Sequence, residues 1–273
     1  MVIFPKTKIN LGLRITGKRH DGYHDIETIF YPVDLCDALE FVVSSGSHNK
    51  DLITITGLET GGLPEDNLVM KGISLLRDRF SFPILKIHLH KAIPAGAGLG
   101  GGSSDAAGIL MGISKCFNLS LENDRLKAYA LELGSDCPFF LENTPSLARG
   151  RGEILEPLDT FLSGYYILLI NQGIGISTRE AYQNCHPQQP SINLSQLIHH
   201  PPEEWKDLII NDFEEFVFRK HPVIGNIKKS LYKSGAIYSS MSGSGSTVYG
   251  IYSEKPVIPE KLKEFVIFEG IMG

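Results

Sequence analysis

The chain has little of what would anchor a protein in a membrane or charge it strongly. No apolar run among its 273 residues approaches the roughly 20 that a membrane-spanning helix needs. The start, Met1–Lys6, lacks a basic segment followed by an apolar segment of signal-peptide length. The net charge of −5 argues against a general basic surface for nucleic acid. We therefore expect a cytoplasmic protein with no nucleic-acid and no membrane partner.

Cysteines are few and scattered. The four are Cys36, Cys116, Cys137 and Cys185, and none forms a C-x-x-C pair, so zinc-ribbon and thioredoxin-like sites have no support. Scattered single cysteines in a chain of this size are typical of a reducing compartment. His88 and His90 share a strand face, but no carboxylate or cysteine nearby completes a metal site. The pair His199-His200 lies in a proline-rich loop and gives no metal-site signal. We expect no metal bound by the protein alone.

The composition is that of an ordinary globular protein, with 42% hydrophobic and 21% charged residues. Alternation from Lys8 to Ile15 predicts a strand with one buried face, with Lys8 and Asn10 on the opposite face. Residues 16–25 are polar and contain two glycines, which predicts a loop. Further strands are predicted over 38–43, 52–56, 84–90, 165–170 and 248–252, and helices over 106–117, 122–133 and most of 203–233.

Strands and helices are mixed along the chain without strict βαβ alternation. This order favours an α+β fold over a doubly wound parallel sheet. A weak shift in composition over 150–163 marks the best candidate for a domain boundary. We therefore expect two domains, over residues 1–155 and 156–273.

The most informative segment is Pro94–Asp105, in which five of the seven residues from 96 to 102 are glycine. Glycines let backbone N–H groups approach an anion, and the start of the helix that follows adds unpaired N–H donors. No lysine follows the glycines, as a Walker loop requires, and the G-x-G-x-x-G spacing lacks the acidic second strand of a Rossmann unit. We predict a phosphate-binding loop, with a flexible linker as the alternative.

Two charged residues are candidates for catalysis. Asp136 follows a predicted helix that ends at Gly134, and a carboxylate near bound phosphates can accept a proton from a substrate hydroxyl. The alternative is an ordinary turn residue. Lys8 begins the first long strand beside Asn10 on the same face, and the alternative for it is a solvated surface charge.

Two further segments are candidates for binding the substrate. Tyr23 and His24 pair an aromatic ring with an imidazole, which together can stack on and hydrogen-bond to a flat base. Ordinary loop residues are the alternative reading of this pair. Residues Ser242–Thr247 form a second loop of small residues, which is either a tight turn or a backbone wall of a pocket.

Together these segments resemble the GHMP kinase superfamily, the galactose, homoserine, mevalonate and phosphomevalonate kinases. The resemblance covers residues 8 to about 250 and rests on Lys8–Leu11, Arg19–His24, Glu65–Leu68, Pro94–Ser104, Gly134–Pro138, Gly150–Glu153 and Gly243–Ser246. It implies an α+β fold of two domains, an N-terminal ATP-binding domain and a C-terminal substrate-binding domain.

The resemblance also implies roles for single residues. It makes Lys8 and Asp136 catalytic, with ATP as the phosphoryl donor and Mg²⁺ arriving with ATP. Residues implied to bind ATP are Asn67, Pro94, Ala95, Gly96, Ala97, Gly98, Leu99, Gly100, Gly101, Gly102, Ser103, Ser104 and Asp105. Residues implied to bind the small-molecule substrate are Asn10, Tyr23, His24, Thr178, Gly243 and Gly245.

The segments Asp21–His24 and Gly134–Pro138 are similar to one branch of the superfamily. That branch works in non-mevalonate isoprenoid precursor synthesis and phosphorylates the 2-hydroxyl of a methylerythritol that carries a cytidine diphosphate group. The Tyr23-His24 pair is implied to read the cytosine, and we expect a monomer or weak homodimer. The alternatives are another GHMP kinase, for a sugar, homoserine or a mevalonate-type alcohol, and a non-catalytic nucleotide-binding protein.

The chain departs from the family pattern at two positions. Lys6-Thr7-Lys8 stands where the family has Pro-Ala-Lys, but only Lys8 keeps the spacing to Asn10. Asp105 stands where many relatives have asparagine. It adds a negative charge beside the phosphate loop, which we expect to be tolerated by capping the helix or facing Mg²⁺.

Overall fold

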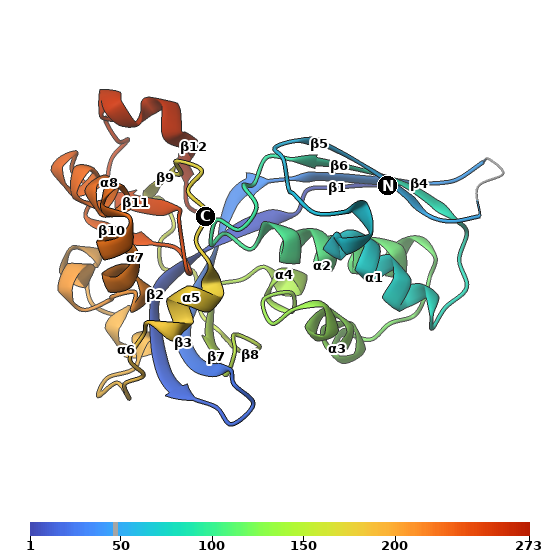
Figure 1. The fold of residues 1–273 in the computed structure, drawn as a ribbon, viewed down its shortest axis with the longest axis horizontal. Helices are drawn as coiled ribbons and strands as arrows, with labels where there is room; N and C mark the ends of the chain where they lie inside the picture. Colours follow the sequence, from blue (N-terminus) through green and yellow to red (C-terminus); the bar gives the residue numbers. More distant parts are fainter. Residues whose placement is uncertain (46–48) are drawn as a thin grey trace. The chain divides into compact units, whose positions relative to one another are not determined.

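The computed structural model describes residues 1–45 and 49–273, which form two compact units (Figure 1). The first unit contains Met1–Thr7, Leu35–Ala95 and Gly100–Asn143, and the second contains Lys8–Asp34, Gly96–Leu99 and Thr144–Gly273. This division differs from the boundary expected near residue 155. It also gives an early stretch of chain and the middle of the glycine loop to the second unit.

The first unit is a four-stranded sheet with helices on one face (Figure 1). The strand order is β1 (Val2–Ile3), β4 (Ala38–Val43), β6 (Leu85–Lys91) and β5 (Leu52–Gly57), and only the β5–β6 pair is parallel. The helices are α1 (Leu68–Arg77), α2 (Gly101–Cys116), α3 (Asn123–Leu133) and α4 (Phe139–Glu142), with a short 3-10 turn η1 (Pro64–Asp66) before α1.

The alternating sequence of β6 explains why the helices cover only one face of this sheet. Leu85, Ile87 and Leu89 are buried, while the residues between them are exposed on the other face. Helix α2 packs into the core along most of its length, since Ala106 through Leu110 are all buried. Small residues permit this close packing: a Cβ on Gly72 of α1 would lie 3.1 Å from Ile109 of α2. Helix α2 therefore packs closely within the core of the first unit.

The second unit contains two antiparallel sheets. One has the order β2 (Lys6–Lys18), β3 (His24–Cys36), β7 (Ser146–Arg149) and β8 (Ile154–Pro157). The other has the order β10 (Tyr238–Met241), β11 (Val248–Tyr252), β9 (Tyr166–Ile170) and β12 (Val266–Ile271). The helices are α5 (Thr178–Gln183), α6 (Leu194–Leu197), α7 (Phe213–Lys220) and α8 (Pro222–Lys233), with 3-10 turns η2 (Pro202–Asp207) and η3 (Glu260–Phe265).

The first long strand is confirmed, but the prediction that only one of its faces is buried is wrong. Strand β2 extends from Lys6 to Lys18, and Lys8 and Asn10 are only 3% and 2% exposed. The predicted loop over 16–25 is a hairpin, because β2 runs to Lys18 and β3 begins at His24. Polar residues can hold such positions because hydrogen bonds from the same unit satisfy them.

Other elements agree with the sequence to different degrees. Strands β4 and β11 match their predicted bounds, and α3 ends at Gly134 as expected. Helix α2 begins at Gly101, five residues earlier than the predicted start at residue 106. Strands β3, β7, β8, β10 and β12 and helices α1 and α5 had not been predicted.

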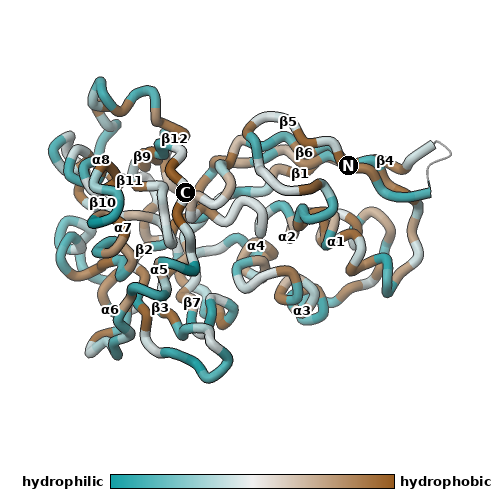
Figure 2. Tube along the Cα trace, viewed as in Figure 1, coloured by the Kyte–Doolittle hydropathy of each residue, from teal (hydrophilic) through white to brown (hydrophobic). Residues whose placement is uncertain are grey.

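Hydropathy along the trace changes within single elements and not between whole regions (Figure 2). Polar and apolar stretches alternate along α1, α7 and α8, each of which buries one side. Within the described part of the chain, none of the helices combines the length and apolarity needed to cross a membrane.

Candidate active site

The glycine loop is divided between the two units. Pro94, Ala95 and Gly100–Asp105 belong to the first unit, and Gly96–Leu99 belong to the second. Gly96, Gly98 and Gly100 have φ angles of 64°, 78° and 71°, which only glycine adopts without strain. Gly100 is the N-cap of α2 and has no side chain to cap the first N–H groups of that helix.

Three consecutive carbonyl groups of the loop are held by the second unit. Thr247 N–H donates to Ala97 O at 3.2 Å, Ser242 Oγ to Gly98 O at 2.7 Å, and Lys8 N–H to Leu99 O at 3.1 Å. In a trans peptide the N–H points opposite to the C=O. The N–H groups of Gly98, Leu99 and Gly100 are therefore directed away from these donors, an arrangement suited to an anion.

Lys8 lies in a polar environment inside the second unit. Its Nζ donates to Asn10 Oδ1 at 2.5 Å and lies 4.6 Å from the centroid of the Phe30 ring. The amide of Asn10 in turn donates to Thr28 Oγ1 at 3.0 Å. A buried ammonium is stable only with such partners, so these contacts fix where the charge of Lys8 lies.

Ser242 joins the glycine loop to the strand of Lys8. Its hydroxyl accepts from the N–H of Asn10 at 3.1 Å while it donates to Gly98 O. Gly243 is equally close: with its φ of 55°, a Cβ there would lie 3.2 Å from Gly98 Cα and 3.3 Å from Asn10 Oδ1. The expected phosphate and substrate segments therefore meet within one unit.

Two more of the expected substrate residues lie at the same turn. Thr178, the first residue of α5, shares a 2.8 Å hydrogen bond with Ser244 through their hydroxyl groups. Gly245 has a φ of 92°, and a Cβ there would lie 2.6 Å from Met241 Sδ. The turn therefore accepts glycine alone at this position.

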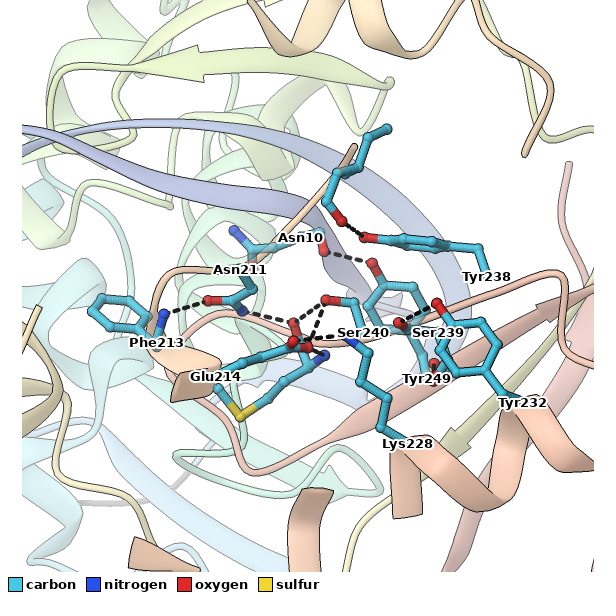
Figure 3. Close-up of polar contacts among 12 residues, drawn as sticks. Asn10, Asn211, Phe213, Glu214, Lys228, Tyr232, Tyr238, Ser239, Ser240 and Tyr249 are labelled. Atoms are coloured by element: carbon cyan, nitrogen blue, oxygen red, sulfur yellow. Dashed lines mark hydrogen bonds and ion pairs between the residues drawn. The ribbon is translucent and has the colours of Figure 1, made fainter. Parts of the chain in front are cut away.

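A buried polar network, drawn in part in Figure 3, holds this turn through hydrogen bonds. Asn211 Nδ2 donates to the carbonyl oxygens of Met241 and Gly243, both at 2.8 Å. Tyr249 donates its hydroxyl to Asn10 O at 2.8 Å, and burial raises the pKa of Tyr249 well above its ordinary value, so the phenol stays neutral. Sequence reasoning missed Asn211, because no motif or periodicity marks it.

Glu214 completes this network (Figure 3). Its Oε1 accepts from Ser240 Oγ at 3.0 Å and from Met241 N–H at 2.8 Å, and its Oε2 pairs with Lys228 Nζ at 2.6 Å. Helices α7 and α8 thus hold the end of β10, where the turn begins.

Tyr23 and His24 lie in the same unit, where the β2–β3 hairpin turns. The side chain of Tyr23 is 57% exposed and the guanidinium carbon of Arg151 lies 5.0 Å from its ring centroid. His24 stacks on Tyr182 with ring centroids 5.1 Å apart, and partial burial lowers the pKa of His24. Sequence reasoning missed Tyr182, although it follows Thr178 by one helical turn and so shares its face of α5.

Asp136 lies in the first unit, in the turn between α3 and α4. Its neighbour Cys137 is buried, and burial raises the pKa of the Cys137 thiol to about 12. The Asp136 carboxylate adds to that rise, and a hydrogen bond with Ser103 opposes it. Because Ser103 is in the first turn of α2, the Asp136 turn lies against the start of this helix.

Asn67 and Asp105, which were also expected to bind ATP, accept hydrogen bonds through their side chains within the first unit. Asn67 caps α1, since its Oδ1 accepts from Val69 N–H at 2.9 Å. The carboxylate of Asp105 turns inward, and its Oδ2 accepts from Lys91 Nζ at 2.7 Å. The expectation that Asp105 caps the helix is wrong, because Gly100 is the N-cap of α2. The side chain of Asp105 is only 3% exposed. Within the described residues, no group of three or more His, Cys, Asp or Glu side chains is placed to hold a metal ion.

Comparison with known proteins gives two matches to family models. The N-terminal domain of the GHMP kinases matches residues 67–143, and their C-terminal domain matches residues 193–267. The chain is 51% identical to the 4-diphosphocytidyl-2-C-methyl-D-erythritol kinase of Bacteroides thetaiotaomicron, over 95% of each chain. It is 38% identical to the kinase of that name from Thermoanaerobacter pseudethanolicus, over 96% of this chain and 91% of the other.

Solved structures agree with these relatives. A crystal structure of 4-(cytidine 5'-diphospho)-2C-methyl-D-erythritol kinase has a TM-score of 0.79 at 29% identity, over 93% of this chain and 91% of the other. The Methanococcus jannaschii mevalonate kinase shares the fold, with a TM-score of 0.65 at 14% identity over 97% and 92% of the two chains. The predicted α+β fold with two GHMP domains is confirmed. The chain belongs to the GHMP kinases and, within them, to the family of the 4-diphosphocytidyl-2-C-methyl-D-erythritol kinases.

Proposed function

We propose that this chain transfers the γ-phosphoryl group of ATP to the 2-hydroxyl of 4-diphosphocytidyl-2-C-methyl-D-erythritol in isoprenoid precursor synthesis. The observation that carries the proposal is the set of three hydrogen bonds to the carbonyl oxygens of Ala97, Gly98 and Leu99. They prepare consecutive N–H groups for a phosphate, and one of the three donors is the backbone of Lys8. A loop that is already ordered loses less conformational entropy when ATP binds.

Phosphoryl transfer depends mainly on positioning and on stabilising charge. We assign the phosphates of ATP to Pro94–Asp105, through backbone N–H groups and the N-terminus of α2, with Asn67 on the adenine side. Mg²⁺ arrives with ATP and neutralises part of the charge on the phosphates.

The acceptor hydroxyl has two proposed catalytic partners. Asp136 accepts the proton of the 2-hydroxyl as it attacks, which its place against the start of α2 supports. Lys8 stabilises negative charge that develops on the hydroxyl oxygen, and Asn10 orients its ammonium. Asp136 belongs to the first unit and Lys8 to the second.

The cytidine end of the substrate is assigned to the hairpin of β2 and β3. Tyr23 offers an exposed ring for stacking, and His24 offers a neutral imidazole fixed by the ring of Tyr182. Thr178, Gly243 and Gly245 form the wall on the side of the erythritol group. We further propose that the protein works in the cytoplasm as a monomer or weak homodimer.

A coupled assay for ADP release tests the reaction. The cytidylyl methylerythritol substrate should support turnover, while galactose, homoserine and mevalonate should not. Turnover with one of these three alone would assign another GHMP activity. No turnover with any acceptor, together with ATP binding in calorimetry, would point to a non-catalytic nucleotide-binding protein.

A further inference from the structure

A buried cluster of three charged side chains lies under the start of α2. Lys91, at the end of β6, pairs with Asp37 on one side and with Asp105 of α2 on the other. The Nζ of Lys91 lies 2.7 Å from Asp105 Oδ2, and its contact with Asp37 is shorter still. The three side chains are 3% exposed or less, and all belong to the first unit.

The two carboxylates are unequally satisfied. Asp37 Oδ1 accepts from the N–H groups of Ala92 and Ile93, at 2.6 and 2.8 Å, and its Oδ2 accepts from Lys91. Asp105 has the ammonium at Oδ2, but its Oδ1 is buried with no hydrogen-bond partner among the described residues. Two carboxylates share one ammonium, and Asp105 is the one left incompletely paired.

The surroundings of Asp105 favour its protonated form. Burial is the largest cause, the charge of Asp37 adds to it and that of Lys91 opposes it, and together they raise the pKa of Asp105 to about 7. The segments packed on α2 contribute apolar residues such as Ile73 and Leu126, and the neutral thiol of Cys137, to the core. The charge of Asp105 is therefore set by the cluster itself.

The cluster is in direct contact with the first turn of α2. A Cβ on Gly101, the first residue of the helix, would lie 3.3 Å from Lys91 Nζ and 2.8 Å from Ile93. Asp105 follows Gly101 by one turn, so its carboxylate lies near the positive end of the helix dipole. A phosphate at this N-terminus would meet the same dipole and would be repelled by an ionised Asp105.

We propose that Asp37, Lys91 and Asp105 position the first turn of α2 for ATP, and that ATP binds more tightly when Asp105 carries a proton. The carboxylate of Asp105 acts here as a positioning group through the helix, and this side chain does not touch ATP. The inference rests on the proposed function, because it needs the phosphates of ATP at the start of α2. Binding linkage is reciprocal, so ATP must also draw a proton onto Asp105.

The matched pair of variants is Asp105→Asn and Asp124→Asn. Asparagine keeps the shape of the Asp105 side chain and removes its titration, while Asp124 is an exposed carboxylate in the first turn of α3. In the wild type and in Asp124→Asn, the KM for ATP should rise about three- to tenfold between pH 6 and pH 8.5. In Asp105→Asn it should stay level over this range and, at pH 8, lie below the wild-type value.

Calorimetry with Mg²⁺-ATP in two buffers of different ionisation heat gives a second readout, which a purely structural role would not move. Near pH 7 the wild type should take up a fraction of a proton when ATP binds, and Asp105→Asn should take up none. Equal pH profiles in Asp105→Asn and the wild type, or ATP binding to the wild type without proton uptake, would overturn the inference alone. No binding of ATP to the wild type would overturn it together with the proposed function.

Discussion

The hydroxyl of Ser242 donates a hydrogen bond to the carbonyl oxygen of Gly98 at 2.7 Å and accepts one from the N–H of Asn10 at 3.1 Å. One fully buried oxygen atom thus links the phosphate loop to the strand that carries Lys8. The three residues are far apart in the sequence, and only the fold of the second unit brings them together.

Replacing Ser242 by alanine should impair binding of ATP more than the stability of the fold. The variant loses the donor to Gly98 and leaves the N–H of Asn10 unsatisfied, which costs about 1–3 kcal/mol. If half of this cost falls on the loop, we expect the KM for ATP to rise about two- to tenfold. Steady-state kinetics with varied ATP measures it.

Ser239→Ala provides the matched control for this prediction. Ser239 is an equally buried serine of β10, and its Oγ donates to Tyr249 O at 2.7 Å. Its removal should lower the melting temperature by a similar amount but leave the KM for ATP unchanged. If both variants changed the KM equally, the link between Ser242 and Gly98 would have no special role in binding.

Asp136→Ala should lose most of the turnover while ATP still binds. A positioned general base contributes about 10²- to 10⁴-fold to a rate, and the proposed role of Asp136 is of this kind. Single-turnover kinetics gives the rate of transfer, and calorimetry gives the affinity for ATP. Near-normal turnover would remove Asp136 from the mechanism, and loss of ATP binding would indicate a structural role for its turn instead.

The catalytic candidates could be found from the sequence because each lies in a short local motif. Lys8 and Asn10 share a strand face. The glycines at 96, 98 and 100 indicate positive φ angles, because glycine adopts them without strain. Burial of Lys8 could not be foreseen, because alternation reports one buried face and says nothing about what covers the other.

The supporting residues escaped prediction for a different reason. Asn211 and Tyr182 act through partners that lie far from them in the sequence, at Gly243 and His24. Such contacts leave no periodic or local signal. The same holds for the split of the glycine loop between two units, because its middle residues are hydrogen-bonded by two distant segments, at Lys8 and at Ser242–Thr247.

Tyr23→Ala should raise the KM for the cytidylyl substrate far more than the KM for ATP. Loss of an aromatic platform costs about 1–3 kcal/mol for each stacked base, which corresponds to about fivefold to more than a hundredfold. Tyr23→Phe keeps the ring and should stay close to the wild type. Steady-state kinetics with each substrate varied in turn measures both constants, and equal increases for Tyr23→Ala would contradict the stacking role.

The pH dependence of substrate binding should follow His24. Burial is the first cause of the lowered pKa of His24, Lys18 adds to it and Asp25 opposes it. The shift favours the neutral imidazole. The KM for the cytidylyl substrate should therefore stay level as the pH falls to 6.5, the usual histidine value, and should rise only at lower pH. The stability of the fold should change in the same pH range. Because the unfolded chain binds the proton at a higher pH than the folded chain, His24 lowers the free energy of unfolding as the pH falls below 6.5.

Two measurements check this prediction. NMR titration of the imidazole protons of His24 should give a pKa below 6.5, the usual histidine value. A pH profile of the KM, taken with the wild type and with His24→Gln, should show the acid rise in the wild type only. If the rise began above pH 6.5, the pKa of His24 would not be lowered by its burial beside Tyr182, and the prediction would be wrong.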